Sequence, residues 1–123
     1  MGLAGDRLHI FNTPALEDPS PDICICEGEI DAMSCRQAGL PAVGIAGVNG
    51  WKRMFRRAFR GYRNVFIMTD NDDKGQGLEW AEEVANDIGT TSRITLMPKG
   101  HDVNSLLQAE GTDGIINLLK GGK

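Results

Sequence analysis

One stretch in the middle of the chain, residues 65–75, constrains the fold more than any other. It reads VFIMTDNDDKG, so an apolar run ends abruptly in Asp70, Asp72 and Asp73. A short apolar run bounded by turn residues is typical of a buried strand, and the pattern from Leu78 onward predicts a helix. The acids are therefore expected at the carboxyl end of a strand, where ligands bind in open α/β sheets. Because grouped carboxylates repel one another, the arrangement indicates a site for a hard divalent cation.

A second junction between a strand and acids lies earlier in the chain. The apolar run at residues 22–26 leads directly into Glu27 and Gly28. A helix is predicted to follow, with Asp31 in its first turn and its end near Gly39. Gly28 is expected to let the backbone turn tightly and approach a ligand closely, because it has no Cβ.

A third acid follows the last predicted strand, residues 93–97, whose loop brings Asp102 to the strand's carboxyl end. Strands alternating with helices at this spacing predict an α/β fold, a mainly parallel sheet of about four strands flanked by helices. In a flavodoxin-like strand order, 2-1-3-4, the first and third strands flank the point where the strand order reverses. Glu27 would then face Asp70 and Asp72.

Hydrophobic periodicity predicts which side chains the helices bury. Apolar residues recur at helical spacing in three segments, and two short helices are expected after residue 104. The residues expected on buried faces are Ile30, Ala32, Met33, Ala38, Leu40, Trp51, Met54, Phe55, Ala58, Phe59, Leu78, Ala81, Val84, Ala85 and Ile88. Cys24, Cys26 and Cys35 are odd in number and lack a zinc-ligand spacing, so we expect them to be small buried hydrophobes.

The length and composition fit one domain. The chain has 123 residues, of which 41% are hydrophobic and 24% charged. Residues 1–21 are expected to form a lead-in or linker with an edge strand near residues 8–11, and residues 22–120 to form the domain. No apolar run approaches the roughly 20 residues that cross a bilayer, and the N-terminus lacks signal-peptide regions. We therefore expect a cytoplasmic protein that does not contact a membrane.

The basic residues are distributed unevenly. Net charge is −4, yet residues 51–63 contain no acid. Two interpretations remain open for the basic side of this segment: contact with a phosphate backbone, or an ordinary solvated face. The residues considered for phosphate contact are Lys52, Arg53, Arg56, Arg57 and Arg60, together with Lys74 beside the acids.

Each acid also has a structural alternative, because Asp and Glu are favoured at helix N-termini and in turns. For Asp102 alone both interpretations stay open. Glu27, Asp70 and Asp72 together favour a shared metal site. Mg²⁺ is commonly held by one or two carboxylates plus substrate phosphate, so such a site suits phosphoryl transfer, with Glu27 as general acid or base.

Three motifs resemble, in this order and spacing, the TOPRIM domain shared by primases, topoisomerases and several nucleases. They are residues 26–32 (CEGEIDA), the Asp70-x-Asp72 pair with Gly75 behind it, and residues 98–104 (PKGHDVN) with Leu106. The resemblance covers about residues 22–111 and is closest to bacterial DnaG-type and phage primases, especially the primase-helicase version.

This resemblance implies a compact Rossmann-like fold, with Glu27 as general acid/base and Asp70 and Asp72 as ligands of Mg²⁺ or Mn²⁺. It also implies that Asp31 and Asp102 line the metal site. Gly28 and Gly75 are expected as structural turn residues. Cellular primases tend to carry an acid two residues after the equivalent of Asp102, where this chain and the phage version have Asn.

Primases of this family also have an N-terminal zinc-binding module and a basic subdomain, and neither fits in residues 1–21. The main hypothesis is therefore a primase catalytic domain that uses single-stranded DNA template and nucleoside triphosphates. A helicase or a separate zinc-binding N-terminal subunit would be its partner. The alternatives are a TOPRIM-type metal-dependent nuclease and a non-catalytic module that binds nucleic acid or a replication partner.

Overall fold

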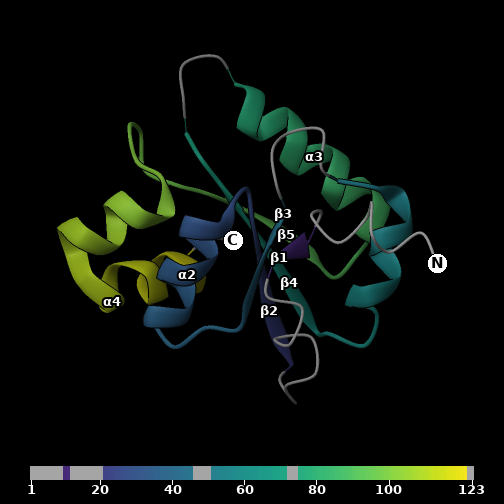
Figure 1. The fold of residues 1–123 in the computed structure, drawn as a ribbon, viewed down its shortest axis with the longest axis horizontal. Coiled ribbons are helices and arrows are strands. Elements are labelled where there is room, and N and C mark those ends of the chain that lie inside the picture. Colours follow the sequence, from purple (N-terminus) through teal and green to yellow (C-terminus); the bar gives the residue numbers. More distant parts are fainter. Residues whose placement is uncertain (1–9, 12–20, 46–50, 72–74, 122–123) are drawn as a thin grey trace.

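A five-stranded sheet organises the computed structural model, which describes residues 10–11, 21–45, 51–71 and 75–121 (Figure 1). The strands are β1 (Ile10–Phe11), β2 (Asp22–Cys26), β3 (Ala42–Ile45), β4 (Asn64–Thr69) and β5 (Ser92–Leu96). Their order is β1-β3-β2-β4-β5; β2 to β5 are parallel, and β1 pairs with β3 in the antiparallel sense. The predicted 2-1-3-4 order of the parallel strands is confirmed, as is an edge strand in the lead-in.

Helices cover both faces of the sheet. On one face lie α2 (Glu29–Gln37) and α4 (Val103–Gly121); on the other lie α3 (Gln76–Ile88) and the 3₁₀ helix η2 (Arg53–Phe59) (Figure 1). The predicted pair of C-terminal helices is present as the two halves of α4, which kinks at Gly111 with φ 74°. No helix in the described part of the chain is long and apolar enough to cross a membrane.

The two faces of the sheet have cores of different composition, because alternate residues of each strand point to opposite sides. Along β2, Ile23 and Ile25 face α3 and η2, whereas Cys24 and Cys26 face α2 and α4. The core under α3 and η2 is rich in aromatic and β-branched side chains, and its aromatic members are 1–8% exposed: Trp51, Phe59, Tyr62 and Trp80. We call these four residues the aromatic core.

The predicted apolar face of α2 is wrong at two of its positions, whereas Ala32 and Ala38 are buried as expected. Ile30 and Met33 are 65% and 51% exposed, whereas the buried face consists of small residues, including Ala32, Ser34 and Cys35. Small side chains let the helix pack closely against both the sheet and α4. Hydrophobic periodicity alone cannot predict that small residues are buried here, because it favours large apolar side chains such as Ile30 and Met33 for the buried face.

Two predictions for the other face also need correction. Residues 53–59 form a 3₁₀ helix, whose three residues per turn place Met54 outward at 65% exposure, while Phe59 at its end is buried. In α3, Leu78 is 39% exposed and Trp80 takes the buried position. An α-helical period of 3.6 was the wrong template for the first segment.

Candidate functional site

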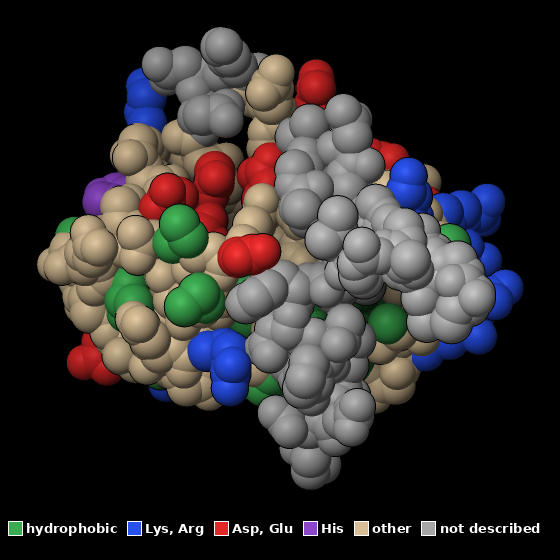
Figure 2. Space-filling view, viewed as in Figure 1, with side chains coloured by type: hydrophobic (Ala, Val, Ile, Leu, Met, Phe, Trp, Pro, Cys, Tyr) green, Lys and Arg blue, Asp and Glu red, His purple; other side chains and the backbone are tan. Residues whose placement is uncertain are grey.

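Four carboxylates meet where the parallel strands end. Glu27 follows β2 and Asp70 follows β4, its neighbour in the sheet, while Asp31 lies in the first turn of α2 and Asp102 immediately precedes α4. All four are partly buried. We call these four residues the acidic edge, and Figure 2 shows acidic side chains gathered in a hollow on this side of the molecule. The predicted approach of Glu27 and Asp70 is confirmed, because both contribute to one electrostatic cluster.

The electrostatic strain of the acidic edge centres on Asp70. Burial raises the pKa of this carboxyl to about 7, and the negative charges of Asp31, Glu27 and Asp102 add to the shift. A hydrogen bond with Asp31 favours the proton on Asp70. Burial also raises the pKa of Asp31, although the hydrogen bonds from the Asn104 N–H and with Asp70 oppose this shift. Asp70 Oδ1 is buried and accepts no hydrogen bond from any residue that the structure describes. A buried carboxylate oxygen in this state is suited to a cation.

Asp31 is held by a small polar contact between α2 and α4. The backbone N–H of Asn104 donates to Asp31 Oδ1 at 3.2 Å, and Ser34 Oγ donates to Asn104 Oδ1 at 3.0 Å. Ser34 could not be predicted from the sequence, because a serine within a helix carries no motif. Asn104 was noted only as a departure from an acidic position.

Asn71 fixes the loop that carries Asp70. Its side-chain Nδ2 donates to the carbonyl of Met97 at 3.0 Å, and its backbone N–H and C=O bond to His101 and Gly100. The loop after β4 is thereby attached to the loop after β5. One feature of the sequence could have indicated this role: Asn71 is an amide residue between two acids, Asp70 and Asp72, at the end of a strand.

Asp102 also caps a helix, which is the structural alternative left open for it. Its Oδ1 accepts the backbone N–H of Ser105 at 2.8 Å, and Ser105 Oγ lies 2.8 Å from His101 Nδ1. Asp102 nevertheless adds to the negative field at Asp70. The cap fixes its carboxylate next to the other three.

The glycines near the site act differently from the prediction for Gly28. Gly28 has φ 175°, which any residue adopts, and open space where a Cβ would be. The close approach occurs instead at Gly44, where a Cβ would lie 2.7 Å from the carbonyl oxygen of Gly28. Similarly, a Cβ on Gly77 would lie 2.8 Å from the Asp70 carbonyl. Gly75 is a turn residue as predicted, with φ 72°.

The basic surface lies apart from the acidic edge. Arg53 Nε is 4.0 Å from Asp87 near the end of α3, and Arg56 donates to the carbonyl of Arg53. In Figure 2 most Lys and Arg side chains are at the opposite side of the view from the acidic hollow. The members of this surface that the structure describes are Lys52, Arg53, Arg56, Arg57 and Arg60. Lys74 and Asp72 lie outside the described residues.

The residues present fit a hard divalent cation. Within the described ranges, no three His, Cys, Asp or Glu side chains are placed to hold an ion by themselves. Mg²⁺ does not need such a cage, since it usually keeps several waters and takes one or two carboxylates plus substrate phosphates. The unpartnered Oδ1 of Asp70 within a cluster of acids supplies that kind of ligand.

Known proteins with sequences similar to this chain include a Toprim-like family, a phage protein and bacterial DNA primases. A family model described as Toprim-like matches residues 24–107. The Gene 57 protein of Mycobacterium phage D29 is 44% identical over 119 residues, which is 97% of this chain and 76% of that protein. A DNA primase of Pseudomonas putida is 31% identical over 100 residues, 77% of this chain but 15% of the primase.

Solved structures show the same fold. The primase fragment of the bacteriophage T7 primase-helicase protein has a TM-score of 0.76 at 20% identity, over 89% of this chain and 47% of that one. A DNA primase domain from Pseudomonas aeruginosa has a TM-score of 0.72 at 24% identity, over 86% and 34%. A DnaG catalytic domain bound to single-stranded DNA has a TM-score of 0.69 at 21% identity, over 94% and 40%. The chain spans less than half of each of these solved chains.

Proposed function

Because the chain belongs to the Toprim-like family, and its TOPRIM domain is of the type found in bacterial and phage primases, we propose that it carries out metal-dependent nucleotidyl transfer in RNA primer synthesis. One observation supports this most directly. The buried Oδ1 of Asp70 has no partner among the described residues, although three further carboxylates surround it. Such an arrangement stores repulsion that a cation relieves.

The proposed ion is Mg²⁺ or Mn²⁺, with Asp70 and Asp72 as ligands and Glu27, Asp31 and Asp102 lining the site. The role of Asp72 rests on its motif alone. When bound, the ion would neutralise charge on the triphosphate of the incoming nucleotide. Glu27 would accept the proton of the attacking 3′-hydroxyl, while the Asn104 N–H keeps Asp31 oriented.

The proposed substrates are a single-stranded DNA template and nucleoside triphosphates. One solved relative is a complex with single-stranded DNA, and another is part of a primase-helicase. The chain spans 15% of the DNA primase it matches in Pseudomonas putida, and the remaining functions of such a primase are proposed to act together with this domain. A helicase or a zinc-binding N-terminal primase subunit fits this need.

A substitution at Glu27 tests the chemistry. The chain is incubated with a labelled primer–template, nucleoside triphosphates and Mn²⁺, with and without the N-terminal region of a bacterial DNA primase. We expect Glu27→Gln to lower extension by about 100-fold or more, because a positioned acid or base contributes about 10²–10⁴-fold. Glu29→Gln is the matched control, since Glu29 lies two residues further along the chain, is exposed at the start of α2 and is expected to retain activity.

The same reactions separate the alternatives. Cleavage of labelled nucleic acid in Mn²⁺ without nucleotides, lost in Glu27→Gln, would identify a nuclease. Binding that persists in chelator, with neither extension nor cleavage, would identify a non-catalytic module. Either result would replace the proposed primer synthesis.

We assign the basic surface a role in holding the template backbone. Its exposed arginines include Arg57 and Arg60, which have their side chains in solvent. For single strands the slope of log K against log salt is about −0.7 for each phosphate contact. The double substitution of these two residues to Gln should reduce the slope by about 1.4 units in fluorescence anisotropy with labelled single-stranded DNA. Arg36→Gln, on the other face of the sheet, is the control, and an unchanged slope in the double variant would remove this role.

A further inference from the structure

Three thiols meet inside the core between the sheet, α2 and α4. Cys24 and Cys26 lie on one side of β2, and Cys35 faces them from the last turn of α2. All three are free and are 0–2% exposed. Cys26 Sγ lies 3.6 Å from Cys35 Sγ, and Cys24 is near enough to contribute to the shift in the pKa of Cys35.

We propose that Cys26 and Cys35 form a reversible disulfide that ties the carboxyl end of β2 to the last turn of α2. A disulfide needs a sulfur–sulfur distance of about 2.05 Å, so the two sulfurs must approach by about 1.5 Å. Side-chain rotation supplies movement of this size. Cys26 is the expected partner because its Sγ lies 3.6 Å from the Sγ of Cys35.

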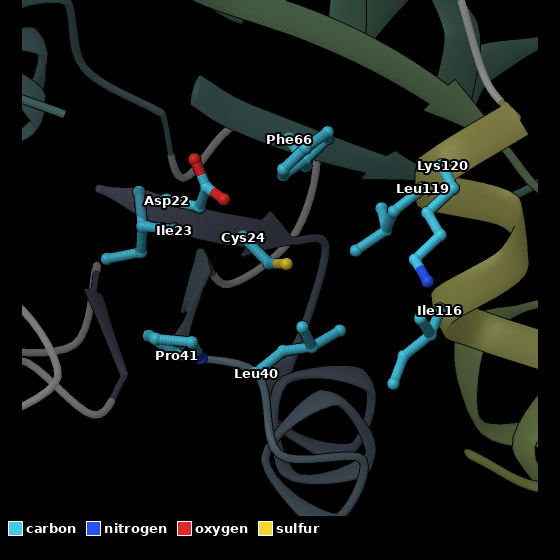
Figure 3. A pocket seen from close by; sticks show the side chains of 9 residues that line it. All are labelled: Asp22, Ile23, Cys24, Leu40, Pro41, Phe66, Ile116, Leu119 and Lys120. Atoms are coloured by element: carbon cyan, nitrogen blue, oxygen red, sulfur yellow. The ribbon is translucent and has the colours of Figure 1, made fainter. Parts of the chain in front are cut away.

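A cavity gives small molecules a route toward these thiols. It has a volume of about 350 Å³ and lies at the amino end of β2, between the residues after α2 and the second half of α4. Figure 3 shows the Cys24 side chain pointing into it between Leu40 and Leu119. An oxidant as small as hydrogen peroxide that enters here is one side chain away from Cys35.

The chemistry balances with a peroxide as the oxidant. The Cys35 sulfur attacks one peroxide oxygen, the O–O bond breaks, and a sulfenic acid and one water form. The Cys26 thiol then attacks the Cys35 sulfur, the S–O bond breaks, and a second water leaves as the disulfide forms. The S–H groups of Cys24 and Cys26 donate to Cys35 and lower its pKa to about 5, which supports Cys35 as the sulfur that reacts first.

The proposed bond joins the two elements that carry half of the acidic edge. Glu27 directly follows Cys26, and Asp31 lies one helical turn before Cys35. The bond would fix the last turn of α2 against the carboxyl end of β2, the two segments beside these carboxylates. We therefore expect oxidation to weaken Mn²⁺ binding by about tenfold, an effect that rests on the proposed function.

Mass spectrometry of the folded chain tests the disulfide without any activity assay. After hydrogen peroxide treatment and alkylation of free thiols, the expected product has lost two hydrogen atoms. Peptide mapping is expected to find Cys26 joined to Cys35 and only Cys24 alkylated, and dithiothreitol should reverse the change. Cys24→Ala should still form the bond, whereas Cys26→Ala should not.

Three results would overturn the proposal: a Cys24–Cys35 bond, over-oxidised sulfur without a crosslink, or no reaction at peroxide levels that oxidise the urea-unfolded chain. The wild-type map alone decides among these, so the outcome does not depend on the folding of a variant. Calorimetry with Mn²⁺ on reduced and oxidised protein tests the coupling separately. Equal Mn²⁺ affinities of the reduced and oxidised protein would contradict the effect of the disulfide on metal binding but not the disulfide itself. No Mn²⁺ binding by the reduced protein would instead contradict the proposed function.

Discussion

The acidic edge and the aromatic core lie on the same sheet but are built on opposite principles. In the aromatic core the rings fit one another, as with Trp51 and Phe59, whose centroids are 6.2 Å apart. In the acidic edge like charges are brought together, and burial raises the pKa of Asp70 to about 7. One region stabilises the fold, and the other is held in place by it.

Each region also contains one buried polar atom without a hydrogen-bond partner among the described residues, and the two atoms differ in meaning. Trp80 Nε1 is a neutral donor, and leaving it unpaired costs about 1–3 kcal/mol. Asp70 Oδ1 belongs to an ionisable group beside three other acids. The first is a modest defect in packing, whereas the second indicates a place for a ligand. Substitutions in the two regions should therefore separate stability from metal binding.

The largest effect on stability is expected in the aromatic core. Phe59→Ala should lower the free energy of unfolding by about 3–5 kcal/mol, because it leaves a cavity where a ring is 1% exposed. Met54→Ala, on the same 3₁₀ helix but 65% exposed, should change it by less than about 0.5 kcal/mol. Urea unfolding measures both values. Equal losses in the two variants would contradict the assigned helix type and its buried side.

A smaller effect of opposite sign is expected in the acidic edge. Folding raises the pKa of Asp70 from 3.8 to about 7, owing to burial and to Asp31, Glu27 and Asp102. The native state therefore binds the proton more tightly than the unfolded chain between these pH values, and stability falls as pH rises through the window. Asn mimics the protonated acid, so Asp70→Asn should match the wild type near pH 4.

At pH 8 in chelator, Asp70→Asn should be about 1–2 kcal/mol more stable than the wild type, a value reduced for solvent screening of this half-buried group. Chemical unfolding at the two pH values measures the difference. A variant less stable than the wild type at pH 8 would show that the acidic edge is a structural ion cluster and not a strained site.

The smallest effect is expected where the two helices beside the acidic edge meet. Asn104→Ala removes one of the two acceptors of the Ser34 hydroxyl, the other being the Ile30 carbonyl, and should lower the free energy of unfolding by about 1 kcal/mol. Asn117→Ala, exposed on the same helix, should leave it unchanged within about 0.5 kcal/mol. Thermal unfolding followed by circular dichroism compares them. If Asn117→Ala cost as much as Asn104→Ala, the contact with Ser34 would have no separate role.

The strand pattern of this chain could be predicted well from its sequence. β2 and β4 are apolar runs that end directly before Glu27 and Asp70, and the order of the four parallel strands was recovered. The helix faces were recovered less well. Ile30 and Met33 mark an apolar stripe, yet α2 buries Ala32 and Cys35, because the space beside α4 suits small side chains.

The grouping of the acids could be predicted from the sequence, but the contacts that support them could not. Acidic residues that follow predicted strands can be recognised in the sequence, and the structure brings four of them together: Glu27, Asp31, Asp70 and Asp102. Contacts such as Asn71 to Met97 join residues distant in sequence and follow no spacing rule. The distance between the basic surface and the acidic edge likewise depends on the whole fold.

Isothermal titration calorimetry of Mn²⁺ against the wild type, Asp70→Asn and Asp113→Asn tests the central claim most directly. Asp113 is an exposed acid on α4 and serves as the matched control. We expect the wild type and Asp113→Asn to bind with equal affinity and Asp70→Asn to bind about 100-fold more weakly or not at all, since even the loss of a group that only orients a metal ligand costs about 10–100-fold. Unchanged affinity in Asp70→Asn would contradict the account of the acidic edge as a metal site.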